Sequence, residues 1–485
     1  MSSSNSFQCK NLNFRYDEYN PLILQDFSIT FNPNEITLIT GVSGSGKSTL
    51  CYILSGLYPE HGGILESGEI LINGINIHSI PINERAKLIG MMFQNANLQF
   101  CTDTPLNEII FCLENIGIPK EEMDLIIERV LSHTEITHLK NYSLNTLSGG
   151  EKQRVALACS LAIGSKWLIL DEPFANLDSE STEKFIKLLY DLKEEYEYSI
   201  IVIDHKISPW LDYMDKMILL GVNGCIISES VSKDNLSDYI KIFHDIGIEY
   251  PGDNYISRVK NNKPSKTIMS LKDISIKYNE YILENLSLEL EIGKIYGIAG
   301  KSGAGKSTLL KVISKNIEYE GTITAHTHNQ SKIFKKSRNE LKIGYIFQDP
   351  QDQFLTNNVL DEIMLSLNAN GINDDNIAKG YLEKVNLWQY RNFSPYMLSQ
   401  GQQRRLGVIS VLAANYDILV CDEPTYAQDF MSVKEIMDLI LSVNMNKEMT
   451  VIIISHNKKL IEQYTDYSFE LVDGILKPIE VNYAI

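Results

Sequence analysis

The sequence predicts an α/β fold that occurs twice in one chain, each copy built on a mainly parallel sheet. A glycine-rich loop, GVSGSGKSTL at residues 41–50, returns as GKSGAGKSTL at residues 300–309, and five further blocks recur with it in one order. Within each copy, short apolar runs alternate with helix-like segments, which is typical of a parallel sheet covered by helices. The chain is therefore expected to hold a duplicated domain.

The strand-like runs lead directly into the motifs. EITLIT and KIYGIAG each precede a glycine-rich turn and a helix-like segment, whereas KWLILDE and DILVCDE end in a pair of carboxylates. Ligands bind at the carboxyl ends of strands in such sheets, so loops and carboxylates should share one edge. We expect a first domain at 5–235, a linker at 236–266 with a helix at 237–250, and a second domain at 267–485.

Composition excludes several classes of protein. The 485 residues carry a net charge of −18, which argues against nucleic-acid binding because that affinity comes largely from Lys and Arg. Seven scattered cysteines without a CxxC pair, and no basic-then-apolar leader, predict reduced thiols in a cytoplasmic protein. The longest apolar runs have the length of a strand, so we expect no membrane-spanning helix.

Both glycine-rich loops fit the pattern GxxxxGK[ST], which binds nucleotide phosphates. Glycines let the backbone wrap phosphate oxygens with its N–H groups, and the following helix presents its positive end. Lys47 and Lys306 should reach the β- and γ-phosphates, and Ser48 and Ser307 should ligate Mg²⁺. The predicted ATP contacts are Gly41, Ser43, Gly44, Ser45, Gly46, Lys47, Ser48 and Thr49, and Gly300, Ser302, Gly303, Ala304, Gly305, Lys306, Ser307 and Thr308.

An Asp-Glu pair and a histidine follow at the same spacing in both copies. Asp171 and Asp422 are placed to hold Mg²⁺ through water, and Glu172 and Glu423 to polarise the attacking water. A pair of solvated acids at a strand end is the ordinary alternative. The matched spacing to the following histidine favours catalysis instead, with a γ-phosphate contact for His205 and His456.

The block LSGGEKQR at 147–154, with LSQGQQRR in the second copy, resembles the signature of the ATP-binding cassette (ABC) family over nearly the whole chain. The resemblance implies tandem P-loop domains, each with an antiparallel β subdomain and a helical subdomain. It implies Q-loop glutamines at Gln94 and Gln348, which contact nucleotide and Mg²⁺, and D-loop residues at Asp178 and Asp429. It also implies that Tyr16 and Tyr278 stack on adenine.

In that family, ATP binds between the phosphate loop of one domain and the signature of the other. The resemblance therefore implies two composite sites, which explains why one chain carries two copies. The implied signature contacts are Ser148, Gly149, Gly150 and Glu151, and Ser399, Gln400, Gly401 and Gln402. Gln400 replaces a glycine, Glu151 replaces a glutamine and could repel nucleotide, and the second D-loop reads YAQD. We expect two hydrolytic sites of unequal rate.

The segment after each Q-loop glutamine resembles the ATPases of energy-coupling factor (ECF-type) importers of vitamins or transition-metal ions. FQDPQDQF followed by LTNNVLDEI is the closer copy, and FQNANLQF has Ala96 in place of proline; Gln99 and Gln353 could still be ordinary loop amides. The resemblance implies a membrane-embedded coupling protein and a substrate-binding membrane protein as partners. It places the chain at the cytoplasmic face of the cell membrane.

Three other classes of cassette protein are alternatives to an ECF-type importer. The chain could serve another transporter branch, such as an exporter. It could be a soluble tandem-cassette translation factor of ABC family F, although such proteins usually have a long charged linker and a basic balance. A DNA-maintenance cassette protein would need a coiled-coil insertion or zinc cysteines, and the sequence has neither.

Overall fold

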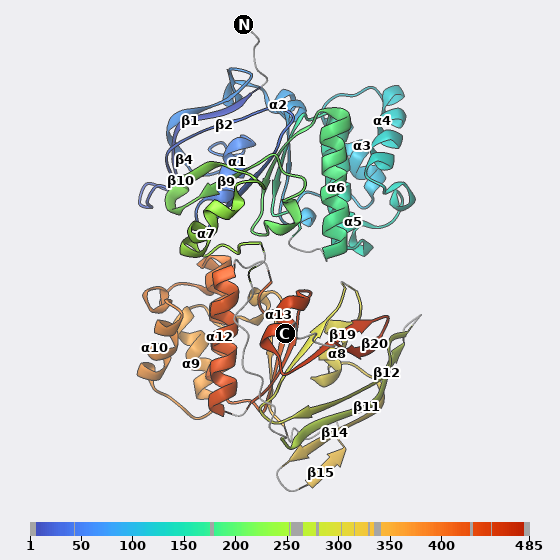
Figure 1. Cartoon of the computed structure of the whole chain (residues 1–485), viewed down its shortest axis with the longest axis vertical. Coiled ribbons are helices and arrows are strands. Elements are labelled where there is room, and N and C mark those ends of the chain that lie inside the picture. The colour runs from blue at the N-terminus through green and yellow to red at the C-terminus, as the bar shows by residue number, and fades with distance from the viewer. Residues whose placement is uncertain are drawn as a thin grey trace. The chain divides into compact units, whose positions relative to one another are not determined.

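The computed structural model describes residues 6–42, 44–174, 179–251, 253, 265–277, 281–301, 303–314, 316–327, 330–333, 341–426, 430–447 and 449–479. The chain divides into two compact units, Met1–Asp253 and Asn254–Ile485 (Figure 1). Each unit combines a six-stranded sheet, a four-stranded sheet and a group of helices. The predicted α/β fold class, with an antiparallel subdomain and a helical subdomain in each unit, is confirmed.

The central sheet of the first unit has the strand order β10-β9-β3-β8-β7-β6. Its strands are β3 (Ile36–Gly41), β6 (Ile89–Met92), β7 (Trp167–Asp171), β8 (Ser199–Ile203), β9 (Lys216–Leu220) and β10 (Ile226–Val231). All neighbours run parallel except β10, which pairs antiparallel with β9. The order brings the ends of β3 and β7 to the same edge, separated only by β8.

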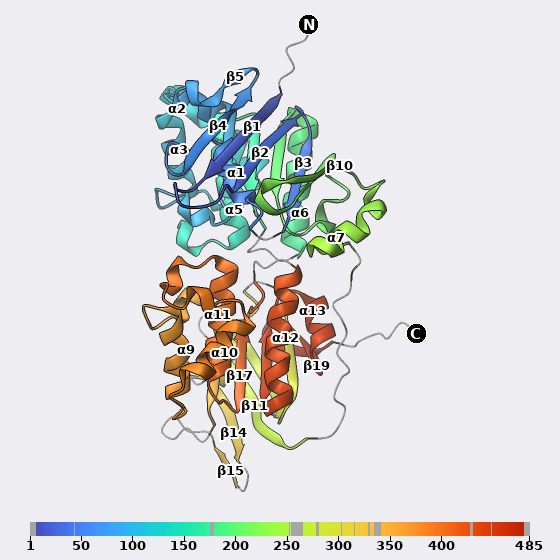
Figure 2. The same ribbon diagram turned by 90° about the vertical axis from the view of Figure 1, so that its left-hand side faces the viewer.

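The rest of the first unit covers this sheet on two faces (Figures 1 and 2). The antiparallel sheet has the order β2-β1-β4-β5, with β1 (Phe7–Arg15), β2 (Leu24–Phe31), β4 (Ile64–Ile72) and β5 (Ile75–Asn76). The helices are α1 (Lys47–Leu54), α2 (Ile82–Leu88), α3 (Pro105–Asn115), α4 (Lys120–His133), α5 (Gly149–Ile163), α6 (Ser179–Tyr196) and α7 (Ile240–Ile246).

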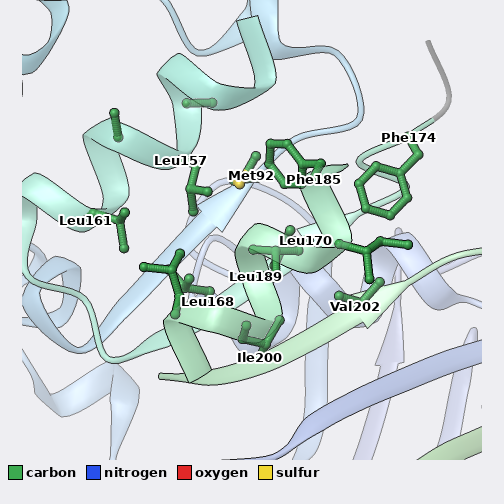
Figure 3. Packing of buried hydrophobic residues seen from close by; sticks show 14 of the residues in the cluster. Met92, Leu157, Leu161, Leu168, Leu170, Phe174, Phe185, Leu189, Ile200 and Val202 are labelled. Carbon is green, nitrogen blue, oxygen red and sulfur yellow. The ribbon is translucent and has the colours of Figure 1, made fainter. Parts of the chain in front are cut away.

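Strand β7 shows how the sheet is buried on both faces. Leu168 and Leu170 face the cluster that includes Leu157 of α5 and Leu189 of α6 (Figure 3). Ile169, which lies between them, belongs instead to the cluster beneath the antiparallel sheet. Successive side chains of a strand point to opposite faces, so an unbroken apolar run fits only a strand covered on both sides.

The second unit repeats this plan. Its antiparallel sheet is β12-β11-β14-β15, and its central sheet is β16-β17-β18-β13-β19-β20. The strands are β11 (Thr267–Lys277), β12 (Tyr281–Glu291), β13 (Ile295–Ala299), β14 (Glu320–Thr327), β15 (Gln330–Ile333), β16 (Ile343–Ile346), β17 (Ile418–Asp422), β18 (Thr450–Ile454), β19 (Tyr467–Val472) and β20 (Ile475–Pro478). The helices are α8 (Lys306–Ile313), α9 (Val359–Asn368), α10 (Asp375–Lys384), α11 (Gln400–Ala413), α12 (Phe430–Lys447) and α13 (Lys458–Tyr464).

The helix predicted at 237–250 is shorter than expected. A 3₁₀ turn covers Leu236–Tyr239, and α7 then ends where Gly247 takes a left-handed conformation with φ 75°. Glycine adopts that conformation at little steric cost, so it terminates the helix. Phe243 of α7 is fully buried in the core of the first unit. The helix therefore packs on that unit, as its apolar positions indicate.

Candidate functional site

In the first unit, β3 ends at Gly41 and α1 begins at Lys47, so the predicted loop joins a strand to a helix. Gly46 has φ 89°, and a Cβ there would lie 2.9 Å from Cγ2 of Ile23. Only glycine fits this close, left-handed turn. The Lys47 ammonium donates hydrogen bonds of 2.9 Å to the carbonyl oxygens of Gly41 and Val42, so the loop curls around it. Ser43 lies outside the described residues.

The loop of the second unit has the same geometry. Gly305 has φ 95°, and α8 begins at Lys306. The Lys306 ammonium donates to the carbonyl oxygens of Gly300 at 2.7 Å and Lys301 at 2.8 Å. Ser302 lies outside the described residues. Both lysines are buried at the N-terminal end of a helix, the end that attracts phosphate.

The carboxylates of the first unit meet the loop and two further segments. The Ser48 hydroxyl donates to Oδ1 of Asp171 at 3.0 Å. One oxygen of Glu172 lies 2.8 Å from Nε2 of His205, and the other accepts a 2.7 Å hydrogen bond from the Gln94 amide. The structure thus brings together five of the predicted residues of this site, from four separate segments.

Burial and neighbouring charges shift the pKa values of the two acids of the first unit in opposite directions. Burial, together with the neighbouring Glu172 carboxylate, raises the pKa of Asp171 to about 7. Burial also opposes the charged form of Glu172, but the hydrogen bond and charge of His205 outweigh it, with help from Lys47, and lower the pKa of Glu172. Glu172 is therefore held as a carboxylate, which polarising a water molecule requires.

The backbone of the two predicted catalytic glutamates is strained in the same way in both units. Glu172 has φ 45° and Glu423 has φ 48°. Residues other than glycine adopt this left-handed backbone region only at an energetic cost. Their amides donate to the carbonyl oxygens of Ile203 and Ile454 at 2.9 and 3.0 Å, which anchors each turn to the next strand. Strain that recurs at equivalent positions is typical of functional sites.

The second unit assembles its site with different contacts. Ser307 lies 3.4 Å from Oδ1 of Asp422, and Glu423 is bonded by Nδ1 of His456 at 3.0 Å, where His205 uses Nε2. Gln348 is exposed, and within the described part of the chain it does not reach Glu423 as Gln94 reaches Glu172. Burial raises the pKa of Asp422. The two sites therefore contain the same types of residue at equivalent positions, but these residues make different contacts.

Both signature segments begin a helix, and the serine that caps each helix is exposed. Ser148 precedes α5, and its backbone amide donates to the Glu151 carboxylate at 2.7 Å; Ser399 precedes α11 and bonds Gln402 at 3.0 Å. These are capping boxes, in which the fourth residue satisfies the start of its own helix. Glu151 thus has a structural partner, which the expectation of repulsion alone did not include. Gln400 is exposed at the first turn of α11.

The predicted adenine contact can be followed in one unit. The Tyr16 hydroxyl is 2.6 Å from Oγ1 of Thr49, while 44% of the residue stays exposed. Its ring is thus anchored beside the phosphate loop and stays partly exposed. Tyr278, Asp178 and Asp429 lie outside the described residues.

Sequence reasoning missed several residues that hold the Q-loop segments. Buried Glu108 accepts bonds from the amides of Cys101 and Thr102 and from the Thr102 hydroxyl, and Glu362 does the same for Leu355 and Thr356. The recurring letters NEI and DEI were the available signal.

The side-chain amides of Gln99 and Gln353 also hold the Q-loop segments through hydrogen bonds. Gln99 donates to the carbonyl oxygen of Met91 at 2.8 Å, and Gln353 donates to that of Gly407 at 2.6 Å. Arg404 also donates to the carbonyl oxygen of Phe347 at 3.1 Å. In the second unit, the Q-loop segment is therefore tied to α11.

The donor set suits Mg²⁺. Ser48 and Asp171, with Gln94 nearby, offer hydroxyl, carboxylate and amide oxygens, and Ser307, Asp422 and Gln348 are their counterparts. Mg²⁺ prefers oxygen ligands and usually binds through one or two carboxylates plus phosphates and water. When bound, it would neutralise charge on the transferred phosphoryl group.

Paired phosphate loops, strand-end acids and helix-capping signatures define a tandem P-loop ATPase. The family model of the ABC transporter matches residues 24–175 and 283–426, which is more than half of the chain, and the chain belongs to this family. It is an ABC ATPase with two fused domains, and its family binds ATP with Mg²⁺.

Known proteins resemble it along nearly their whole length. "Putative HMP/thiamine import ATP-binding protein YkoD" of Bacillus subtilis is 32% identical, covering 96% of this chain and 89% of that protein. "Putative ABC transporter ATP-binding protein SSO1893" of Saccharolobus solfataricus is 30% identical, covering 95% and 92%. The solved structure titled "RNase-L Inhibitor" matches with a TM-score of 0.64 at 19% identity, over 97% of this chain and 91% of that chain, which shows a shared fold alone.

The structure contains no candidate membrane-spanning helix in the ranges that it describes. Within those ranges, every helix is too short or too polar to cross a bilayer.

Proposed function

We propose that this chain is the ATP-hydrolysing energy-coupling subunit of a membrane ABC transporter, an ECF-type importer of a vitamin or a transition-metal ion. In each unit, the lysine would hold the phosphates, the serine and aspartate would hold Mg²⁺, and the glutamate would orient water beside the histidine. The composite pairing of each loop with the other unit's signature is part of this proposal. Two unequal hydrolytic sites are the expected outcome.

An exposed apolar patch on the second unit carries the proposal of a membrane partner. The patch consists of Leu355, Phe393, Tyr396 and Met397, and the exposed fractions of Leu355 and Met397 are 78% and 72%. The patch residues come from two adjacent segments, because the Val359 amide donates to the carbonyl oxygen of Phe393 and the ring of Phe354 lies 5.9 Å from that of Tyr396.

The patch fits a protein partner better than open solvent. Apolar groups gathered on a surface mark interaction sites, and this group lies between the Q-loop and the signature of its unit. The corresponding positions of the first unit are Cys101, Tyr142, Asn145 and Thr146, which are more polar. We expect an apolar cytoplasmic segment of the membrane coupling protein to bind here.

The import direction and the cargo class rest on two supports. The segments after Gln94 and Gln348 resemble those of ECF-type ATPases, and the name of the Bacillus subtilis relative specifies HMP/thiamine import. A soluble tandem-cassette translation factor is the second candidate, because the chain shares its fold, at 18% identity, with a solved structure whose title names an archaeal ribosome recycling factor.

The test is co-purification of the whole chain from gently solubilised membranes of its host, with the bound proteins identified. The proposal expects a coupling-type membrane protein and a small apolar substrate-binding protein. Leu355→Asp with Met397→Asp should release them, while Leu125→Asp, which alters a 74% exposed leucine of α4, should not. Recovery with ribosomes, or without any membrane protein, would refute the transport proposal.

A further inference from the structure

In the second unit, a tyrosine hydroxyl binds Asp422, the aspartate that is predicted to hold Mg²⁺. Tyr345 lies on β16, and its hydroxyl donates a 3.0 Å hydrogen bond to Oδ2 of Asp422. The other oxygen of Asp422, Oδ1, faces the Ser307 hydroxyl at 3.4 Å. The Tyr345 ring is partly buried, with its centroid 4.7 Å from that of Phe347. The tyrosine and the phosphate loop's serine thus contact different oxygens of one carboxylate.

The first unit has a methionine in the same place. In the parallel pairing of β16 with β17, Tyr345 lies opposite Val420, two residues before Asp422. In the pairing of β6 with β7, Met91 lies opposite Ile169, two residues before Asp171. A thioether has no O–H group to donate, so Met91 cannot make this bond.

The bond has a direct consequence for metal binding. A carboxylate that is free to turn about its χ angles loses orientational freedom when it binds a metal, whereas one held by a second hydrogen bond is already oriented. Groups that hydrogen-bond a metal ligand orient it in this way, and removing them typically weakens metal affinity by about 10- to 100-fold.

We propose that Tyr345 is a positioning residue for Mg²⁺ at the nucleotide site of the second unit, and that this unit holds the metal more tightly than the first. The inference rests on the proposed ATPase function and adds a specific difference between the two sites. It concerns Asp422 and the hydroxyl that orients it, not the signature residues.

The test measures metal affinity without turnover. Mn²⁺ replaces Mg²⁺ as a spectroscopic probe, and free Mn²⁺ is titrated by electron paramagnetic resonance in the presence of a non-hydrolysable ATP analogue. The whole chain with Asp171→Asn reports the second unit, and the whole chain with Asp422→Asn reports the first. We expect Mn²⁺ to bind about tenfold more tightly in the second unit, and Tyr345→Phe to remove that advantage.

A matched control separates positioning from packing. Tyr416 packs its ring against Gly344, the neighbour of Tyr345, so Tyr416→Phe should leave Mn²⁺ affinity unchanged. Tyr345→Met, which copies the first unit, should weaken binding as Tyr345→Phe does, with the thermal unfolding of both variants recorded to confirm that they fold. Unchanged affinity in Tyr345→Phe would overturn the inference alone. Absence of any Mn²⁺–nucleotide binding in the Asp171→Asn chain would overturn the proposed function of the second site as well.

Discussion

Replacing Asp171 with asparagine should stabilise the first unit in the absence of metal and nucleotide. Asp171 is buried beside Glu172, and its pKa rises from 3.8 to about 7. A pKa that differs by one between the folded and unfolded states corresponds to about 1.36 kcal/mol, so ionising this group costs the folded state up to about 4 kcal/mol. Asparagine cannot ionise, and its side-chain oxygen can still accept the bond from Ser48.

The sign of the pH dependence follows from which state binds the proton. Below pH 3.8 the folded and unfolded states are both protonated, and Asp171 costs nothing. Between 3.8 and about 7 the unfolded state ionises first, so the stability of the unchanged protein falls as pH rises. Above about 7 the full cost is present. The advantage of Asp171→Asn should therefore grow from acid pH to neutral pH and then level off.

Urea denaturation in EDTA, following the transition of the first unit, is the assay. We expect Asp171→Asn to raise the unfolding free energy by about 2–4 kcal/mol at pH 8 and by less than half as much at pH 5. The same difference at both pH values, or destabilisation at pH 8, would refute the reasoning. Added Mg²⁺ with ATP should favour the unchanged protein instead, since only the carboxylate binds the metal well.

Three further outcomes test the site and the fold. Glu172→Gln and Glu423→Gln, made singly, should each remove part of the steady-state ATPase rate and by unequal amounts; equal losses would contradict the predicted asymmetry, and no loss from one would make that site structural. Glu108→Ala should lower the unfolding free energy by about 3 kcal/mol in urea, because three hydrogen-bond donors lose their buried acceptor. A loss below about 1 kcal/mol would mean that water replaces the carboxylate. Phe243→Ala should lower the unfolding free energy by about 3–5 kcal/mol, with Leu125→Ala as the control at an exposed position. An equal loss in the two variants would contradict the inference that α7 belongs to the core.

The local motifs could be predicted because their geometry depends on neighbouring residues in the chain. A buried strand, a glycine turn and a helix beginning at Lys47 require only short-range conformational preferences, and the same holds for the second loop. The helix at 237–250 was overextended because helical periodicity continued past Gly247, whereas that glycine's left-handed conformation ends the helix. Internal repetition then identified equivalent positions without any further information.

Which side chains meet was decided by tertiary structure. The Ser48 and Asp171 side chains are 123 positions apart in sequence, and they meet because β8 alone separates β3 from β7. Tyr345 reaches Asp422 across 77 positions only because β16 pairs with β17 in one register. Strand order and register arise from long-range pairing of backbone groups, which a local pattern does not encode. The sequence by itself determined which two sets of residues are the predicted site residues, and the packing of the sheet decided that the two sets make different contacts.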